Sequence, residues 1–266
     1  ASGFFGGGHD LIVARRHFVD GATHDSQLAS SGTLSVDEHA RFVSYTVEST
    51  RMAYDINRYA RYVAVFQNWL KPAGASFDHL HKQLVTIDER GAQHEATLAR
   101  LRGNPNLFNE AGPNYAARRN LVIAESGHAV AFAGFGHRYP TIEIHSTSES
   151  SDPWELRDDE VRGMSDMIHA MHAATGPAIP CNEEWHYRPI DVTLAMPWRV
   201  LLKWRISTLA GFEGATKIYL NTIAPATLRD RVVTALLDLR ERGLIAPGLA
   251  IGDEAPGRPN PLRYRR

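Results

Sequence analysis

The chain has 266 residues, of which 43% are hydrophobic, and its 29 basic and 30 acidic side chains leave a formal charge of −1. This length is enough for one large domain or two modest ones with a substantial core. The near-neutral charge excludes a basic nucleic-acid coat and an acidic tail, and no apolar run approaches the roughly 20 residues of a membrane span. Cys181 is the single cysteine, which excludes an intramolecular disulfide, whereas thirteen histidines are unusually many. We therefore expect a soluble, cytoplasmic protein that binds neither nucleic acid nor membranes.

The first half of the chain combines predicted strands with one long helix. Ser35 and Glu38 have the spacing of a capping box, with serine at the N-cap and glutamate three residues later. The helix that they open runs to about residue 58, because apolar residues recur near helical spacing. Apolar, β-branched and aromatic residues predict strands at 9–14, 62–67 and 79–87, and a polar helix is expected at 90–102.

The second half repeats this order loosely. It follows a segment, residues 103–120, whose Asn, Gly and Pro residues predict a linker. We therefore expect an α+β protein with two similar halves, residues 1–105 and 106–266, each an antiparallel sheet with a packed helix. The elements predicted in the second half are a hairpin of 121–124 with 129–133, strands at 141–145 and 200–206, and helices at 158–174 and 225–242.

The most informative segment, residues 74–83, places histidines on a predicted strand directly after a loop of small residues. Alternate residues of a strand face the same side, so His79, His81 and Gln83 line one face. The backbone N–H groups of the preceding Gly-Ala-Ser loop can wrap an anion. A neutral imidazole attacks phosphorus to form a reactive phosphoramidate, and a glutamine amide donates to a phosphoryl oxygen. Two histidines at this spacing alone are more often structural, but the loop and Gln83 favour a catalytic role.

Three short segments belong together, namely Phe66-Gln67-Asn68, Gly74-Ala75-Ser76 and His79-Leu80-His81-Lys82-Gln83. They resemble the signature of the galactose-1-phosphate uridylyltransferase family of the histidine-triad superfamily, and their spacing agrees with that family without a gap. The strand at 8–13, followed by His17, is similar to a strand of that family. Residues 210–225 are similar to its sugar-binding segment, especially in the ADP-glucose phosphorylase branch. The resemblance therefore covers most of the chain.

The resemblance implies roles for residues of this signature. His81 occupies the place of the nucleophile, which takes up a nucleoside monophosphate as a covalent nucleotidyl-histidine. Gln83 stands where hydrolytic relatives have a third histidine, and the glutamine is associated with transferases and phosphorylases. Ser76 and Asn68 match positions that contact phosphate and orient the histidine. The nucleotide- and phosphate-binding set implied in this way is Asn68, Gly74, Ala75, Ser76 and Gln83.

Further ligands and a partner are implied outside this segment. Glu213, beside Phe212, matches a glutamate that binds hexose hydroxyls and in the family serves the partner subunit's site, so we expect a homodimer. His17 and His79 match two ligands of a structural zinc. The other two zinc ligands of the family are a Cys-x-x-Cys pair, which we expect in a segment preceding Ala1.

Several positions depart from the family pattern. Leu80 replaces a proline and is harmless on the outward face. Lys82 replaces a glycine and points away from the histidines, either as a solvent-facing side chain, which we favour, or as one that steers phosphate. Arg199 and Lys203 stand on a strand that is rich in histidine in the family. They argue against a second metal there, although His186 fits it, and this basic pair instead suits a phosphate.

Other candidate residues are interpreted as structural. The glycine-rich residues 3–8 lack the lysine of a phosphate-binding loop and predict only the entry to a strand. His169 and His172 lie three residues apart on a predicted helix, and we expect them at the surface rather than on a metal. Cys181 has no basic neighbour that would activate it. Trp154, Trp185 and Trp198 are expected to be core or rim aromatics.

These observations predict an enzyme that moves a nucleoside monophosphate between sugar phosphates through His81. One alternative is a phosphorylase of a nucleotide sugar or a dinucleoside polyphosphate, in which inorganic phosphate is the acceptor. Another is a non-catalytic nucleotide-binding homologue, whereas Gln83 disfavours a hydrolase. The expected ligands are a nucleotide sugar, a sugar phosphate and zinc.

Overall fold

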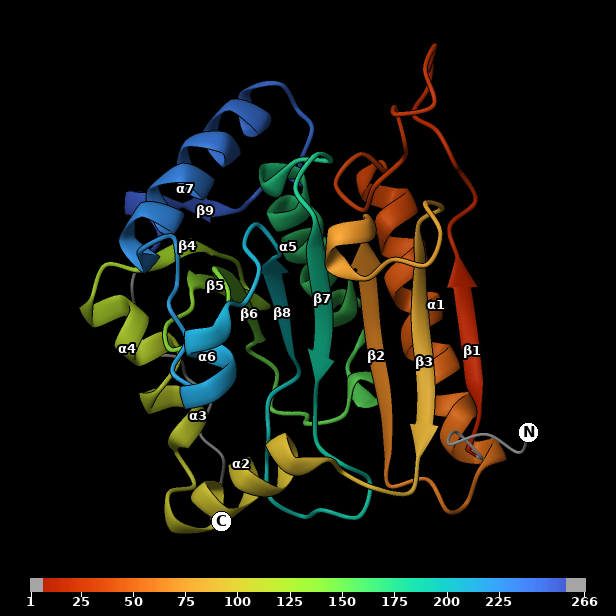
Figure 1. The fold of residues 1–266 in the computed structure, drawn as a ribbon, viewed down its shortest axis with the longest axis vertical. Coiled ribbons are helices and arrows are strands. Elements are labelled where there is room, and N and C mark those ends of the chain that lie inside the picture. The colour runs from red at the N-terminus through yellow and green to blue at the C-terminus, as the bar shows by residue number, and fades with distance from the viewer. Residues whose placement is uncertain (1–6, 257–266) are drawn as a thin grey trace.

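Among residues 7–256, nine strands form one antiparallel sheet that continues through both halves of the chain (Figure 1). The structure is a computed structural model that describes residues 7–256. Of the predicted glycine-rich strand entry, residues 3–6 lie outside the described residues. Neighbouring strands follow the order β1-β3-β2-β7-β8-β6-β5-β4-β9. The strands are β1 (His9–Val13), β2 (Tyr62–Trp69), β3 (His81–Ile87), β4 (Val122–Glu125), β5 (Ala129–Ala133), β6 (Thr141–Ser146), β7 (Cys181–His186), β8 (Arg199–Trp204) and β9 (Ala250–Ile251).

Helices cover both faces of this sheet. In Figure 1, α1 and α5 lie behind the central strands, whereas α2 and α6 lie in front of the sheet. The helices α1 and α5 pack against each other, and α7 packs against α5 and against β4 and β5. The helices are α1 (Val36–Ile56), α2 (Ala92–Gly103), α3 (Leu107–Glu110), α4 (Pro113–Arg118), α5 (Asp158–Thr175), α6 (Gly211–Thr216) and α7 (Pro225–Glu241), and the 3-10 turns are η1 (Lys71–Ala73), η2 (Pro153–Glu155) and η3 (Gly252–Glu254).

The sheet contains the same strand–helix–strand–strand unit twice. One copy consists of β1, α1, β2 and β3, and the other of β6, α5, β7 and β8. In each copy the last strand lies between the other two, and the copies meet where β2 pairs with β7. Asn68 and His81 are separated in the first copy by the same number of residues as His186 and Arg199 in the second. The α+β fold of two similar halves is therefore confirmed, and both halves belong to one sheet.

The sequence signals for helix ends are confirmed. The Ser35 Oγ accepts a hydrogen bond from the Glu38 backbone N–H at 3.2 Å, and Glu38 Oε2 accepts one from the Ser35 N–H at 2.8 Å. This capping box starts α1. Helix α7 begins at Pro225, and Gly243 just beyond its end has a φ of 66°, a conformation that glycine adopts without strain.

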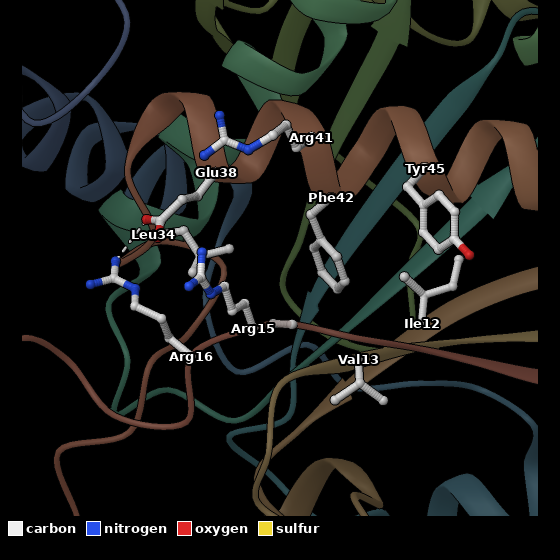
Figure 2. Close-up of a pocket in the computed structure, with 10 residues that line it drawn as sticks. Ile12, Val13, Arg15, Arg16, Leu34, Glu38, Arg41, Phe42 and Tyr45 are labelled. Atoms are coloured by element: carbon white, nitrogen blue, oxygen red, sulfur yellow. Dashed lines mark hydrogen bonds and ion pairs between the residues drawn. The ribbon is translucent and has the colours of Figure 1, made fainter.

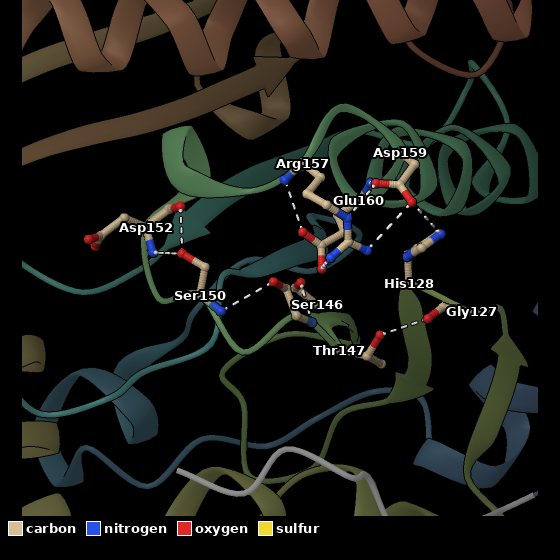
Figure 3. A network of polar contacts seen from close by, with 10 residues as sticks. Gly127, His128, Ser146, Thr147, Ser150, Asp152, Arg157, Asp159 and Glu160 are labelled. Atoms are coloured by element: carbon tan, nitrogen blue, oxygen red, sulfur yellow. Dashed lines mark hydrogen bonds and ion pairs between the residues drawn. The ribbon is translucent and has the colours of Figure 1, made fainter. Parts of the chain in front are cut away.

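A series of serines leads the chain from β6 towards α5 (Figure 3). Each hydroxyl accepts a hydrogen bond from the backbone N–H two residues later, Ser146 from Ser148 at 3.1 Å and Ser148 from Ser150 at 3.2 Å. Glu160 then accepts from the Arg157 N–H at 2.9 Å at the start of α5. Side chains thus satisfy backbone donors that no strand or helix reaches.

Two parts of the chain differ from the prediction. Residues 103–120 are not a bare linker, because α3 and α4 form there and pack on each other. The central strand β7 was not predicted, because Asn182 and Glu183 interrupt its apolar pattern. Both side chains are buried, and each has polar partners from elements distant in sequence. Within residues 7–256, no helix is long and apolar enough to span a membrane.

The hydrophobic core lies between the sheet and the helices α1 and α5. Val43, Val63, Met164, Ile168 and Leu202 are fully buried in it. The strand alternation therefore directs one set of side chains into this core. The other set of β2, β3 and β7 side chains lies on the opposite face, which we call the open face, and this set includes His81 and Asn68.

Candidate active site

His81 begins β3 on the open face and is 2% exposed. In the pairing of β2 with β3, Phe66 lies opposite Gln83, so the same register places Asn68 opposite His81. The His81 Nδ1 lies 2.7 Å from the carbonyl oxygen of His79. A carbonyl can only accept, so Nδ1 carries a proton, and in a neutral ring Nε2 then holds the free lone pair. Such a ring can act as a nucleophile at Nε2.

An aromatic ring lies over this imidazole. The ring centroids of Phe77 and His81 are 3.9 Å apart and the planes are inclined by 17°. Phe77 itself is 42% exposed, in the loop before β3. Sequence reasoning did not single out Phe77, because a loop phenylalanine carries no pattern of its own. Its ring limits the approach of water to the histidine.

The predicted phosphate loop follows β2 directly. Its backbone turns sharply, with a φ of 66° at Leu70 and 88° at Gly74. The Asn68 Nδ2 lies 3.5 Å from the Gly74 carbonyl oxygen. Asn182 of β7 donates from Nδ2 to Asn68 Oδ1 and to the Ala73 carbonyl, both at 2.7 Å. Asn182 therefore holds the loop and Asn68 together, and only the pairing of β2 with β7 reveals it.

Gln83 and Ser76 complete the predicted phosphate-binding set. Gln83 lies on the same face as His81, with its Oε1 3.1 Å from His9 Nε2. When His9 donates this bond, the Gln83 NH₂ group is the part of the amide that can donate to a ligand. Ser76 is exposed at the end of the loop, as is Gly74. The structure thus brings Asn68, the loop, His81 and Gln83 to one end of the sheet.

A cleft of about 530 Å³ extends from this end over β2 and β7. The volume falls within the range of about 300 to 1,000 Å³ that is usual for small-molecule sites. Ala64 and Phe66 line it from β2, and Arg205 lines it from the end of β8. Asn68 also belongs to the lining, so the cleft is continuous with the predicted phosphate site.

The polar groups of the cleft are mostly paired. Lys203 Nζ donates to Glu184 Oε2 at 2.6 Å. Burial acts to raise the pKa of Glu184, but hydrogen bonding to His186 and the charge of Lys203 outweigh it and lower the pKa to about 2. Lys203 is thus held by a carboxylate in this structure. Arg199 lies with its guanidinium 4.3 Å from the centroid of the Phe108 ring.

A second groove, of about 250 Å³, lies between β1 and α1 (Figure 2). Ile12 and Phe42 line it, and Arg16 donates to Glu38 at 2.8 Å on one side. None of the predicted site residues contributes to its lining. The cleft over β2 and β7 is therefore the candidate site.

The prediction for Lys82 was wrong, and so was the outward position of Leu80. Lys82 does point away from His81, but it is fully buried, with Nζ 2.5 Å from Glu183 Oε1 and 3.2 Å from Gln67 Oε1. Leu80 is 1% exposed. The physical reason is that β3 is covered on this side by α1 and its neighbours, so the side facing away from the site is core rather than solvent.

The surface positions expected for His169 and His172 were also wrong. Both lie on the inward side of α5 and are buried. His172 Nε2 lies 2.7 Å from Glu183 Oε2, and His169 Nε2 lies 2.8 Å from the Leu34 carbonyl oxygen. The charge of Lys82 and the bond from His172 hold the pKa of Glu183 well below its ordinary value, although burial acts to raise it. Cys181 is buried, which agrees with its predicted structural role.

His17 and His79, the predicted zinc ligands, lie next to each other. Their ring centroids are 4.8 Å apart, with planes inclined by 24°. The His17 Nδ1 is buried without a partner, and His79 Nε2 lies 2.7 Å from the Ala14 carbonyl oxygen, which leaves its Nδ1 for a metal. Two adjacent imidazoles fit half of a four-ligand zinc site. Among residues 7–256, no three His, Cys, Asp or Glu side chains are arranged to hold a metal.

The predicted sugar-binding residues lie apart from His81. Phe212 is 49% exposed, whereas Glu213 is 8% exposed and its Oε2 accepts from the Ala210 N–H at 3.1 Å. Their helix α6 is well separated from β3 in Figure 1. Neither residue lines the cleft over β2 and β7.

The fold of the described residues is that of solved uridylyltransferase and ADP-glucose phosphorylase structures. A solved uridylyltransferase structure superimposes with a TM-score of 0.71 at 18% identity, covering 86% of this chain and 75% of that one. An ADP-glucose phosphorylase from Arabidopsis thaliana with bound ADP-glucose superimposes with a TM-score of 0.68 at 20% identity, covering 84% and 80% of the two chains. These likenesses show that the fold is shared and confirm the predicted resemblance.

Residues 1–264 match the family described as Domain of unknown function (DUF4921), and the chain belongs to that family. In sequence it is also similar to an ADP-glucose phosphorylase from Arabidopsis thaliana, with 26% identity over 230 residues. That alignment covers 82% of this chain and 62% of the relative. The chain therefore spans less than two thirds of the length of this curated relative.

Proposed function

We propose that this protein is a nucleotidyltransferase that moves a nucleoside monophosphate between sugar phosphates through a covalent nucleotidyl-histidine on His81. The observation that carries the proposal is the bond from His81 Nδ1 to the His79 carbonyl, which leaves Nε2 as the nucleophilic atom. Asn68 and the loop beside it lie at the same end of the sheet, and Gln83 lies on the same face. The names of the relatives, uridylyltransferase and ADP-glucose phosphorylase, support this class of reaction.

In the first half-reaction, the His81 Nε2 attacks the α-phosphorus of the nucleotide sugar. The new N–P bond forms as the bond from phosphorus to the bridging oxygen breaks, and the sugar phosphate leaves with that electron pair. The proton on Nδ1 stays in its bond to the His79 carbonyl, which stabilises the positive charge that develops on the ring. Gln83 and the N–H groups of the loop donate to the phosphoryl oxygens.

In the second half-reaction, an oxygen of the acceptor phosphate attacks the same phosphorus. The N–P bond breaks and its electron pair returns to Nε2, so neither half-reaction requires a proton transfer at His81. Gln83 supports transfer over hydrolysis because an amide cannot accept a proton from an attacking water as an imidazole does. Phe77 lies over the ring and keeps water from the intermediate.

The test is to incubate the protein with UDP-glucose or ADP-glucose labelled at the α-phosphorus and to measure acid-labile, alkali-stable label on the protein. We expect close to one equivalent on the wild type, none on His81→Asn, and unchanged labelling of His24→Asn, which replaces an exposed histidine. A folded wild type that takes no label from any nucleotide contradicts the proposal. Nucleotide binding without label identifies a non-catalytic homologue.

A phosphorylase is the second candidate, and the name of the sequence relative, ADP-glucose phosphorylase, favours it. The first half-reaction is then the same, and inorganic phosphate takes the place of the acceptor sugar phosphate. Rates of label release by phosphate, by glucose 1-phosphate and by galactose 1-phosphate separate the two candidates. A dinucleoside polyphosphate used as the donor tests the remaining substrate class.

Zinc and a second subunit belong to the proposal as well. His17 and His79 would hold two positions of a structural zinc, which would tie the loop after β1 to the start of β3. Elemental analysis of the purified protein and of His17→Ala measures the zinc content directly.

In a homodimer, Glu213 and Phe212 would serve the site of the second copy, because α6 lies away from β3 of its own chain. Sedimentation equilibrium measures the oligomeric state.

A further inference from the structure

We propose that Arg205 binds the phosphate group that is not transferred, namely the β-phosphate of the nucleotide sugar and then the phosphate of the acceptor. The inference rests on the proposed function and adds to it a residue for the second phosphate. Arg205 follows β8 directly, and its backbone N–H donates to the Pro180 carbonyl at 2.7 Å. In Figure 1, the C-terminal end of β8 and the N-terminal end of β3 lie at the same, upper end of the strands.

Hydrogen bonds connect the Arg205 guanidinium to the predicted phosphate loop. Its Nη1 donates to Asn182 Oδ1 at 2.8 Å. Asn182 in turn donates to Asn68 and to the Ala73 carbonyl, both at 2.7 Å. Asn68 lies opposite His81 in the register of β2 and β3. One continuous set of contacts therefore links the guanidinium, the loop and the strand position of the nucleophile.

The charge of Arg205 has no counter-ion among residues 7–256. Its one side-chain hydrogen bond is to the neutral Asn182 amide, its Nε is buried without a partner, and its guanidinium lies 4.6 Å from the centroid of the Tyr139 ring. Arg90 in the same cleft differs, because it bonds both oxygens of Asp191 and also Glu95. A half-buried guanidinium without a carboxylate partner is costly unless an anion binds it, and its fork of donors matches a phosphate.

The spacing of the strands places this cation beside the reaction. Neighbouring strands lie about 4.8 Å apart, so Asn182 is about 10 Å from the backbone of His81 across β2. A diphosphate with its α-phosphorus at His81 extends its second phosphate over Asn68 towards Asn182. The Arg205 side chain reaches the same point from the far side of Asn182. When the acceptor oxygen attacks and the N–P bond breaks, Arg205 holds the acceptor phosphate and balances its charge.

The experiment compares two donors that can transfer a nucleoside monophosphate to His81, a step that we call loading. A nucleoside 5′-phosphorimidazolide carries no second phosphate, whereas a nucleotide sugar does. For Arg205→Gln, which keeps a donor for Asn182 but removes the charge, we expect normal loading from the imidazolide and weakened loading from the nucleotide sugar. Release of the loaded nucleotide by inorganic phosphate should then need about 10- to 100-fold more phosphate than in the wild type, as expected for one charge-assisted hydrogen-bond pair.

Two further variants make the result specific. Arg205→Lys retains the charge and should recover part of the affinity for phosphate. Arg100→Ala removes an exposed arginine of α2, outside the cleft, and should behave as the wild type. The inference is overturned if Arg205→Gln discharges with wild-type phosphate dependence, or if it loses imidazolide loading and nucleotide-sugar loading equally. A wild type that loads from neither donor contradicts the proposed function instead.

Discussion

The ammonium Nζ of Lys82 lies 2.5 Å from Glu183 Oε1, and neither side chain is exposed to solvent. Lys82 stands between His81 and Gln83 on β3, while Glu183 stands between Asn182 and Glu184 on β7. The pair therefore joins the two strands that carry the site, across β2 and behind the face where the chemistry is proposed. Gln67 of β2 contacts the same ammonium at 3.2 Å, so all three strands contribute.

Replacing Lys82 with Met should destabilise the protein by about 3–5 kcal/mol, because it leaves the Glu183 carboxylate buried without its cation. Urea unfolding followed by circular dichroism measures this. The double variant Lys82→Met/Glu183→Gln should recover most of the loss, since the amide is neutral and can still bond His172 and Trp185. If the free energy of unfolding of Lys82→Met lies within 1 kcal/mol of the wild-type value, Lys82 and Glu183 do not form a charged pair.

The stability should depend on pH through His94. Burial, together with repulsion from His186, lowers the pKa of His94 from its ordinary value of 6.5 to about 4. Because His94 has the lower pKa in the folded state, the folded protein binds this proton less readily than the unfolded chain does. The stability linked to neutral His94 is therefore complete above pH 6.5 and is lost as the pH falls towards 4. The loss amounts to about 3 kcal/mol at most.

The variant His94→Asn isolates this contribution. Its amide can replace the Nδ1 donor, which lies 2.9 Å from the Arg90 carbonyl oxygen. Unfolding free energies of both proteins at pH 8 give the cost of the substitution itself. Between pH 6.5 and 4 the unfolding free energy of the wild type should fall by more than that of the variant. If the two free energies fall in parallel with pH, His94 is not the group responsible.

Phe77 should protect the nucleotidyl-histidine from water. A stacked aromatic pair contributes about 1 kcal/mol, so Phe77→Ala should release the loaded nucleotide to water about fivefold faster. Phe77→Tyr keeps the ring and should retain the wild-type rate. Because Phe77 is 42% exposed, the alanine variant should lose little beyond the stacking contact, and its melting temperature should fall by only about 2–4 °C. Equal rates of hydrolysis in the wild type and Phe77→Ala would exclude the shielding role.

Gly32 should tolerate no side chain. A Cβ at this position would lie 2.4 Å from the backbone nitrogen of Ala173 in α5, where only the backbone could move away. We expect Gly32→Ala to cost about 3 kcal/mol, which lowers the melting temperature by roughly 10 °C in a chain of this size. Gly103→Ala is the matched control, because no atom lies within 4 Å of its Cβ, and it should leave the melting temperature unchanged or higher.

The sequence alone predicted most elements whose signals are local. The capping box of Ser35 and Glu38 started α1, and the strand pattern at 62–67 marked most of β2. The spacing of Asn68, the loop, His81 and Gln83 was sufficient to place these residues together, because they lie on two adjacent strands and the turn between them. Each of these inferences needs only neighbours in the chain.

Tertiary structure alone decided the surroundings of these residues. Lys82, His169 and His172 were expected at the surface, yet each is buried with a partner that lies elsewhere in the chain. Asn182 and Arg205 entered the site only because β2 pairs with β7 and β8 lies beside β7. Alternation along a strand shows which side chains share a face, but not whether that face meets water or a helix. Local pattern therefore singled out His81 and its strand, whereas long-range pairing determined which polar groups are buried and which cation lies beside the cleft.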